Sequence, residues 1–143
     1  MKKLFALLPL VVALTLLNSC SGTAQQTTTS PVSTQQSAPA TGLTNLDPAG
    51  FQKARKENPA AVVLDVRTPA EFAQTHIDGA VNIDLRDPNF ANQIQKLDKS
   101  QTYLVYCRTG KRSAMACQLM QNEGFSSLYN LEGGIVAWQA AGN

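Results

Sequence analysis

Short apolar runs alternate with segments of helical periodicity from Leu43 to the end of the chain. The runs are rich in β-branched and aromatic residues and predict four strands, at residues 61–66, 80–83, 102–106 and 127–131. A short helix is expected after Thr68, and longer helices are expected at residues 48–56, 90–97, 111–123 and 135–141. Because strands and helices alternate, we expect an α/β fold with a mainly parallel central sheet flanked by helices.

Local signals place several of these boundaries. Asp47 and Pro48 form an N-cap and N1 pair at the start of the first helix. Thr68 and Glu71 have the spacing of a capping box, and Gly124 follows the helix at residues 111–123 as a C′ residue. The continuous β-type run at residues 61–66 is typical of a strand that is buried on both faces.

The first twenty residues have a different pattern. A charged start is followed by an apolar run over residues 4–17, which is shorter than the roughly 20 residues that a membrane-spanning helix needs. This combination is typical of an export signal. The stretch from Leu17 to Cys20 resembles the lipobox of bacterial lipoproteins, in which residues 1–19 are removed and Cys20 is lipidated. The alternative is an ordinary signal peptide that is cut nearby, with Cys20 incidental.

Residues 20–42 are expected to form a lipid-anchored tether. From Ser21 to Gly42 the only large aliphatic residue is Val32, and there is no charged or aromatic residue. Such a stretch cannot bury enough apolar surface to offset its ordering entropy, so we expect it to be flexible. The expected folded domain is residues 43–143. Because Ser21 rather than Asp follows Cys20, resemblance to lipoprotein sorting rules favours the outer membrane, facing the periplasm.

Charge and cysteine content narrow the function classes. Lys and Arg total 12 and Asp and Glu total 10, and Lys2 and Lys3 account for the excess. The rest of the chain is balanced, which gives no electrostatic indication of nucleic acid binding. The three cysteines are an odd number, which argues against a simple disulfide framework in an exported protein. At least one thiol is therefore expected to have a chemical role.

Cys107 is the candidate nucleophile. It directly follows the predicted strand at residues 102–106, and ligands of parallel α/β sheets bind beyond the carboxyl ends of strands. The next residues are Arg108, Thr109, Gly110, Lys111 and Arg112. Gly110 allows the chain to curl onto the start of the next helix, where inward N–H groups form an anion nest. A thiol in such a nest has a lowered pKa, which favours the nucleophilic thiolate.

Three ordered segments resemble the signatures of the rhodanese family. Residues 64–72 (LDVRTPAEF) and 76–82 (HIDGAVN) are similar to its N-terminal signature, and residues 107–113 (CRTGKRS) are similar to its active loop. Gly133 and Gly134, with Trp138, are similar to its C-terminal signature. The match spans about residues 43–143. Thr75 departs from the pattern, because the family commonly has Gly before the His, and we expect this to affect only local backbone geometry.

The resemblance implies a rhodanese-like three-layer domain that acts as a thiosulfate sulfurtransferase, without a metal or organic cofactor. Cys107 would attack the outer sulfur of thiosulfate or a similar anionic donor, release sulfite and retain a persulfide. A thiol or cyanide would then accept the sulfur. Arg108, Lys111 and Arg112 would hold the donor, together with the N–H groups of the loop at Thr109 and Gly110. The oligomeric state does not follow from the sequence.

Two further residues that carry reactive groups are expected to be structural. Cys117 lies inside a predicted helix among apolar residues that include Met115 and Leu119, which favours core packing over the role of a resolving thiol. His76 is the only histidine, but it falls in a structural signature, and sulfur transfer by a thiolate needs no general base. Trp138 is also expected in the core.

Three charged residues are expected to lie near the site and to hold the scaffold. Asp65 and Arg67 end the first predicted strand on the active-site side of the sheet. Arg67 is expected to pair with Glu71 across the following turn. This pair would orient the backbone near the loop and leave the substrate to other cations.

Two other functions stay open. Phosphatases of the same fold use a Cys-to-Arg loop one residue longer, whereas residues 107–112 have the shorter, sulfurtransferase length. A membrane-tethered persulfide carrier or binding module would keep Cys107 but would not catalyse turnover.

Overall fold

The computed structural model of the protein describes residues 42–143. The expected signal peptide, Cys20 and the expected tether up to residue 41 lie outside the described residues. A five-stranded sheet forms the centre of the domain, with strand order β1-β5-β4-β2-β3 and every neighbouring pair parallel. The strands are β1 (Gly42–Leu46), β2 (Val62–Asp65), β3 (Val81–Asn82), β4 (Thr102–Tyr106) and β5 (Ser127–Leu131). The expected α/β fold is confirmed, and the sheet is entirely parallel.

The strand β1 is the one that the apolar pattern does not predict. Thr44 and Asn45 interrupt its sequence, so it has no clear alternation of apolar and polar positions. It lies at the edge of the sheet and is held by pairing with β5, in a register that sets Gly42 opposite Ser127 and Leu46 opposite Leu131. The Asn130 side chain also donates a hydrogen bond to Asn45 Oδ1, at 2.9 Å. This strand therefore depends on contacts between distant parts of the sequence.

Within residues 42–143, five helices accompany the strands. They are α1 (Pro48–Glu57), α2 (Pro69–Gln74), α3 (Phe90–Ile94), α4 (Lys111–Asn122) and α5 (Gly134–Ala140). The predicted caps are confirmed: the Asp47 carboxylate accepts from the Gly50 N–H at 2.7 Å, and Thr68 and Glu71 form a complete capping box. Helix α3 ends three residues earlier than expected, because the chain turns where the Leu97 N–H donates to the Ile94 carbonyl.

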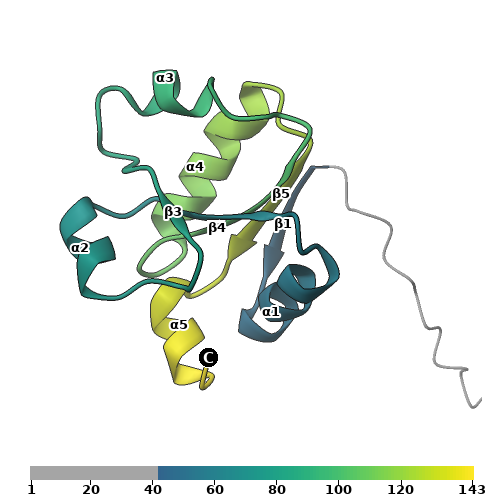
Figure 1. Cartoon of the computed structure of the whole chain (residues 1–143), viewed down its shortest axis with the longest axis vertical. Coiled ribbons are helices and arrows are strands. Elements are labelled where there is room, and N and C mark those ends of the chain that lie inside the picture. Colours follow the sequence, from purple (N-terminus) through teal and green to yellow (C-terminus); the bar gives the residue numbers. More distant parts are fainter. Residues whose placement is uncertain (1–41) are drawn as a thin grey trace, which may run out of the picture. The chain divides into compact units, whose positions relative to one another are not determined.

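The helices cover both faces of the sheet and make three layers (Figure 1). On one face, Phe51 of α1 and Trp138 of α5 pack with Leu104 and Tyr106 of β4. On the other face, a second cluster joins β4 to α3 and α4 through Tyr103, Val105, Phe90, Ile94, Ala116, Cys117 and Met120. Alternate residues of β4 thus enter opposite layers, which is why this strand is apolar throughout. The expected burial of Cys117 and Trp138 is confirmed.

The outward face of α4 differs from the expectation for its apolar residues. Met115 and Leu119 are 59% and 46% exposed, so they do not surround Cys117 in the core. They lie one helical turn apart, whereas Ala116, Cys117 and Met120 form the stripe that contacts the sheet.

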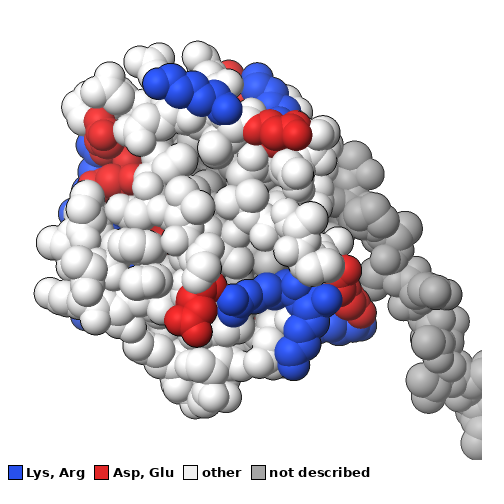
Figure 2. All heavy atoms as spheres, viewed as in Figure 1, with Lys and Arg blue, Asp and Glu red and all other residues white. Residues whose placement is uncertain are grey.

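Figure 2 shows Lys and Arg side chains on one face of the domain with Asp or Glu side chains beside them. No helix among residues 42–143 is both long enough and apolar enough to cross a membrane.

Candidate active site

Cys107 follows β4 at the carboxyl edge of the sheet and is 1% exposed. The loop after it leads directly into α4, and Gly110 is the N-cap residue of that helix, with φ 88°. This left-handed backbone conformation strongly favours glycine, and it turns the chain back toward the sulfur. The predicted placement of Cys107 and Gly110 at a strand end and a helix start is therefore confirmed.

The Cys107 sulfur lies within a set of hydrogen-bond donors. The Gly110 N–H donates to Sγ at 3.2 Å, and the Ser113 hydroxyl lies 3.5 Å from it. Burial opposes charge on the thiol, but hydrogen bonds from Ser113 and from the N–H groups of Thr109 and Gly110 together outweigh it. The pKa of Cys107 is consequently below its ordinary value. A lowered pKa favours the thiolate, which is the form of the thiol that attacks sulfur.

Ser113 is the functional candidate that the sequence analysis leaves without a role. It is fully buried in the first turn of α4, and its hydroxyl also lies 3.0 Å from the Gly110 carbonyl oxygen. Its position six residues after Cys107 brings it under the curled loop. A serine in the first turn of a helix that follows a cysteine loop is the signal that would have indicated it.

The start of α5 holds the other side of the loop. The Ile135 N–H donates to the Cys107 carbonyl at 2.9 Å, and the Val136 N–H donates to the Arg108 carbonyl at 3.3 Å. Gly134 permits this close approach, because it has φ 59° and a Cβ there would overlap the backbone of Cys107 and Arg108. The loop carbonyls are thus bonded to α5, while loop N–H groups are free to face the sulfur.

The ion pairs near the site differ from the expected ones. Arg67 does not pair with Glu71. Instead, Glu71 accepts hydrogen bonds from both Nη atoms of Arg112, at 2.7 and 2.9 Å. Hydrogen bonding to Arg112 lowers the pKa of Glu71 from its usual 4.5 to about 2. Glu71 also completes the capping box of α2, so one carboxylate joins the start of α2 to the active loop. Arg112 is therefore already engaged before any donor arrives.

Arg67 pairs instead with Asp65, the carboxylate at the end of β2 that lies two residues before it. Both side chains are buried, and Arg67 donates to the Asp65 carboxylate through Nε and Nη2, the latter at 2.6 Å. Arg67 Nη2 also donates to the Thr75 carbonyl at 2.6 Å, and its guanidinium lies over the Tyr106 ring. Asp65 and Arg67 thus hold the end of β2 to the segment after α2.

Two cations of the loop are exposed, Arg108 and Lys111. Neither takes part in an ion pair within the described part of the chain, whose ion pairs involve other residues. A hollow of about 340 Å³ borders the loop at Arg108, and we call it the Arg108 hollow. Its lining comprises Arg67, Glu71, Gln74, Thr75, Arg108, Ile135, Val136 and Gln139. The exposed cations are suited to attract an anion toward the loop, whereas Cys107 itself is not among the residues that line the hollow.

The other residues with reactive groups lie apart from this chemistry. Cys117 is fully buried and, like Cys107, is a free cysteine. Burial raises the pKa of its thiol to about 12. His76 stacks on Phe72, and its Nδ1 lies 3.0 Å from the Phe72 carbonyl oxygen. Among residues 42–143, no three His, Cys, Asp or Glu side chains are arranged to hold a metal ion.

A model of the family described as "Rhodanese-like domain" matches residues 48–141. The chain belongs to the rhodanese-like domain family. Several relatives are named for sulfur transfer. Over 100 residues the chain is 29% identical to a sulfurtransferase of Allochromatium vinosum, a match that covers 70% of the chain and 92% of that relative. Over 85 residues it is 35% identical to the thiosulfate sulfurtransferase GlpE of Pseudomonas putida, a match that covers 59% of the chain and 76% of GlpE.

A larger protein named for sulfur transfer also matches, and solved structures give the same family. The chain is 43% identical over 76 residues to the probable adenylyltransferase/sulfurtransferase MoeZ of Mycobacterium tuberculosis, a match that covers 53% of the chain but only 19% of MoeZ. A rhodanese-related protein from Thermoplasma volcanium superposes with a TM-score of 0.60 at 30% identity, covering 68% of the chain and 92% of that structure. A rhodanese-like domain from Anabaena gives 0.61 at 30% identity, covering 69% and 75%. These relatives support a sulfur-transfer role.

Proposed function

We propose that this domain is a thiosulfate sulfurtransferase that carries sulfane sulfur as a persulfide on Cys107. The observation that supports it most directly is the set of donors around the Cys107 sulfur, from Gly110 and Ser113, in a relative of named sulfurtransferases. Loop N–H groups that stabilise a thiolate also suit a persulfide anion, because its negative charge is on the outer sulfur, only about 2 Å beyond the Cys107 sulfur.

The first step forms the persulfide. The Cys107 thiolate attacks the outer sulfur of thiosulfate, so a sulfur–sulfur bond to Cys107 forms and the bond to the sulfonate group breaks. The bonding electrons leave with sulfite, and the persulfide keeps the charge of the thiolate. Arg108 and Lys111 attract the dianionic donor, because they are the exposed cations of the loop. Arg112 stays with Glu71 and positions the loop.

The second step returns the enzyme to its starting state. The thiolate of an acceptor, or cyanide, attacks the outer sulfur of the persulfide. A new bond to that sulfur forms, the bond to Cys107 breaks, and the electron pair remains on the Cys107 thiolate. The reaction exchanges only sulfur, so neither step requires a metal or organic cofactor.

Cys107→Ser tests the proposal, with Cys117→Ala as its matched control. We expect Cys107→Ser to abolish thiosulfate-to-cyanide transfer, because an alcohol does not form the persulfide. Cys117→Ala should keep most of the activity, because its thiol is buried and has a raised pKa. Mass spectrometry of the wild type after thiosulfate should find one added sulfur on Cys107. Transfer by the Cys107→Ser variant at the wild-type rate would contradict the mechanism.

Two other functions are distinguished by kinetics. A non-enzymatic persulfide carrier would gain one sulfur on Cys107 but would show no repeated turnover with excess thiosulfate and cyanide. A phosphatase would hydrolyse aryl phosphates. We expect little such hydrolysis, because the loop from Cys107 to Arg112 has the shorter sulfurtransferase length and Arg112 is paired with Glu71.

The proposed setting of this activity is the outer membrane, facing the periplasm, with a lipid anchor on Cys20. Support comes from the resemblance of the stretch from Leu17 to Cys20 to a lipobox, which lies outside the described residues. Cys20→Ala should release the protein from the membrane fraction and leave its transfer activity unchanged. A wild-type chain that is recovered unmodified at Cys20 in the soluble fraction would refute the anchor.

A further inference from the structure

The strand β1 leaves one edge of the sheet open. In the sheet of residues 42–143, β1 pairs with β5 on one side and has no strand on its other side (Figure 1). The opposite edge is β3, which has only two residues and so offers little backbone for pairing. β1 has five residues and contains neither a charged residue nor a proline, which are features that often protect an edge strand. The edge at β1 is therefore able to pair with a further strand.

The backbone groups of β1 that face away from β5 are those of Leu43 and Asn45. The Gly42 N–H and the Leu46 carbonyl bond to the residues that flank β5, at 2.6 and 2.8 Å. Backbone groups of alternate residues in a strand face the same side, so those of Thr44 face β5 as well. The N–H and C=O groups of Leu43 and Asn45 consequently face outward, and within residues 42–143 they have no hydrogen-bond partner.

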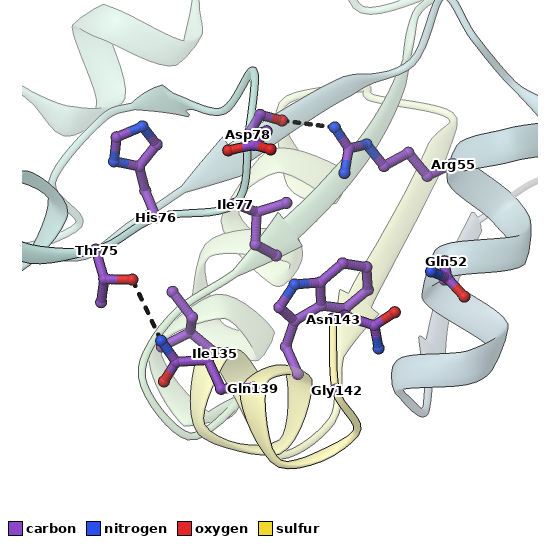
Figure 3. A pocket seen from close by; sticks show the side chains of 11 residues that line it. Gln52, Arg55, Thr75, His76, Ile77, Asp78, Ile135, Gln139, Gly142 and Asn143 are labelled. Atoms are coloured by element: carbon purple, nitrogen blue, oxygen red, sulfur yellow. Dashed lines mark hydrogen bonds between the residues drawn. The ribbon is translucent and has the colours of Figure 1, made fainter.

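Helix α1, which follows β1, covers a face of the sheet and leaves this edge open. Phe51 of α1 packs edge-on against Trp138 of α5, with ring centroids 5.8 Å apart. Arg55 of α1 reaches across the same face to the segment after α2, where it donates to the Asp78 carbonyl at 2.7 Å (Figure 3). Both contacts hold α1 toward the middle of the sheet, away from the outer side of β1.

No net charge opposes the approach of a second copy of the domain. Lys and Arg total 12 in the chain, and two of them are Lys2 and Lys3, which leaves ten against the ten Asp and Glu of residues 42–143. A net charge far from zero would keep two copies apart, whereas this domain is neutral. The α4 side chain beside the start of β1 is also uncharged, because Gly42 lies next to the amide of Gln121.

We propose that β1 is the contact of a two-fold dimer, in which it pairs antiparallel with β1 of a second copy. A two-fold axis brings the same surface of both copies together, so the two strands run in opposite directions. With the axis at Thr44, Leu43 lies opposite Asn45 of the second copy, and Asn45 lies opposite Leu43 of the second copy. All outward N–H and C=O groups of β1 then bond across the axis, and this is the one antiparallel register of β1 that pairs them all. The contact is independent of the proposed function.

Disulfide trapping tests this register. The two Thr44 residues face each other as a non-hydrogen-bonded pair, with Cα atoms about 4.5 Å apart, a distance that a disulfide spans. The two Asn45 residues are offset by two positions and lie roughly 8 Å apart, which is too far. All variants carry Cys20→Ala and Cys107→Ala, and Cys117 is buried. Under mild oxidation we expect Thr44→Cys to form a disulfide-linked dimer on non-reducing electrophoresis, and Asn45→Cys, the matched control, to stay monomeric.

Analytical ultracentrifugation tests the dimer without a covalent link. The reference is the Cys20→Ala chain, which lacks the proposed lipid anchor, and we expect it to show a reversible monomer–dimer equilibrium. Adding Asn45→Pro removes an outward N–H from each copy and keeps the bonds of β1 to β5, because proline is tolerated where the N–H of an edge strand faces solvent. Its dissociation constant should rise tenfold or more, since two bonds across the axis are lost.

Two results would overturn the proposal. One is an equal yield of disulfide-linked dimer from Thr44→Cys and Asn45→Cys, which would show that contacts between copies do not follow this register. The other is a reference chain that stays monomeric at its highest soluble concentration, which would leave the edge to solvent or to a strand of another protein. Urea unfolding checks that Asn45→Pro is folded, and the cysteine pair decides the question if it is not.

Discussion

Glu71→Gln tests the ion pair that joins α2 to the active loop. In the folded protein both Nη atoms of Arg112 donate to the Glu71 carboxylate, and the Thr68 N–H donates to the same carboxylate at 3.1 Å. Glutamine can keep the capping box, because it is the other residue that completes this motif. The substitution therefore removes the charge of the pair while it preserves the start of the helix.

The size of the effect follows from the geometry of the pair. Hydrogen bonds to charged groups are worth about 1.5–3 kcal/mol, and glutamine can still accept one bond from Arg112. The side chains of Arg112 and Glu71 are 18% and 29% exposed, so solvent screens part of their attraction. We expect the free energy of unfolding to fall by about 2 kcal/mol at pH 7. For a domain of this size the melting temperature should fall by roughly 8–16 °C.

The loss should depend on pH in a defined direction. The folded-state pKa of Glu71, about 2, is below its usual 4.5. A carboxyl group with a lowered folded-state pKa stabilises the protein fully above its unfolded pKa, and this stabilisation is lost as the pH falls through the folded pKa. The difference between wild type and Glu71→Gln should thus be complete at pH 7, and it should shrink between pH 4.5 and pH 2.

Urea unfolding followed by the fluorescence of Trp138 measures this difference at pH 7 and at pH 3. The matched control is Glu57→Gln, which breaks the exposed pair of Lys53 and Glu57 on α1, where the charged atoms are 3.8 Å apart. That pair should contribute less than about 1 kcal/mol. Equal stabilities of wild type and Glu71→Gln at pH 7, or an undiminished difference at pH 3, would show that this account of the pair is wrong.

Three other predictions concern the loop. Ser113→Ala should raise the pKa of Cys107, because it removes a hydrogen-bond donor to the thiolate. The rate of persulfide formation should then fall roughly tenfold at neutral pH and recover in alkaline buffer. An unchanged pH profile of this rate would exclude the role of Ser113. Gly134→Ala should lower the free energy of unfolding, measured in urea, by more than about 2 kcal/mol. Gly79→Ala should lower it by about 1 kcal/mol, because Gly79 also has a positive φ, 75°, but has open space around it. Equal losses in the two variants would refute the close approach of α5 to the loop. Replacing both Arg108 and Lys111 with Ala should raise the KM for thiosulfate tenfold or more and leave the KM for 2-mercaptoethanol nearly unchanged, and equal effects on both substrates would contradict donor binding by these cations.

The candidate nucleophile, Cys107, could be placed from the sequence because the features that position it are contiguous. A buried strand, a cysteine, a glycine turn and the first turn of a helix follow one another within residues 102–113. Strand and helix periodicity places the cysteine at the carboxyl edge, and the glycine indicates the curl of the loop. The strands β4 and β5 have the predicted bounds, because each is a compact apolar run between turn residues.

The features that could not be predicted depend on residues that are far apart in the sequence. Glu71 and Arg67 are one helical spacing apart, which favours a local pair, but the fold brings Arg112 to Glu71 across 41 residues. The edge strand β1 is likewise stabilised by β5, which lies about 85 residues later. The exposure of Met115 and Leu119 could not be predicted either, because apolar character alone does not indicate which face of α4 packs against the sheet.

The entirely parallel sheet separates the start of the described domain from the candidate nucleophile. Gly42 pairs with Ser127, and Thr102 pairs with the same Ser127, so β1 and β4 begin at the same end of the sheet. Cys107 follows the far end of β4, which at about 3.3 Å per residue is roughly 17 Å away along the strands. A surface, resin or fusion partner that is coupled directly before Gly42 is therefore attached at the end of the sheet opposite the Cys107 sulfur. Immobilisation through that end is a practical way to present the loop to substrates in solution.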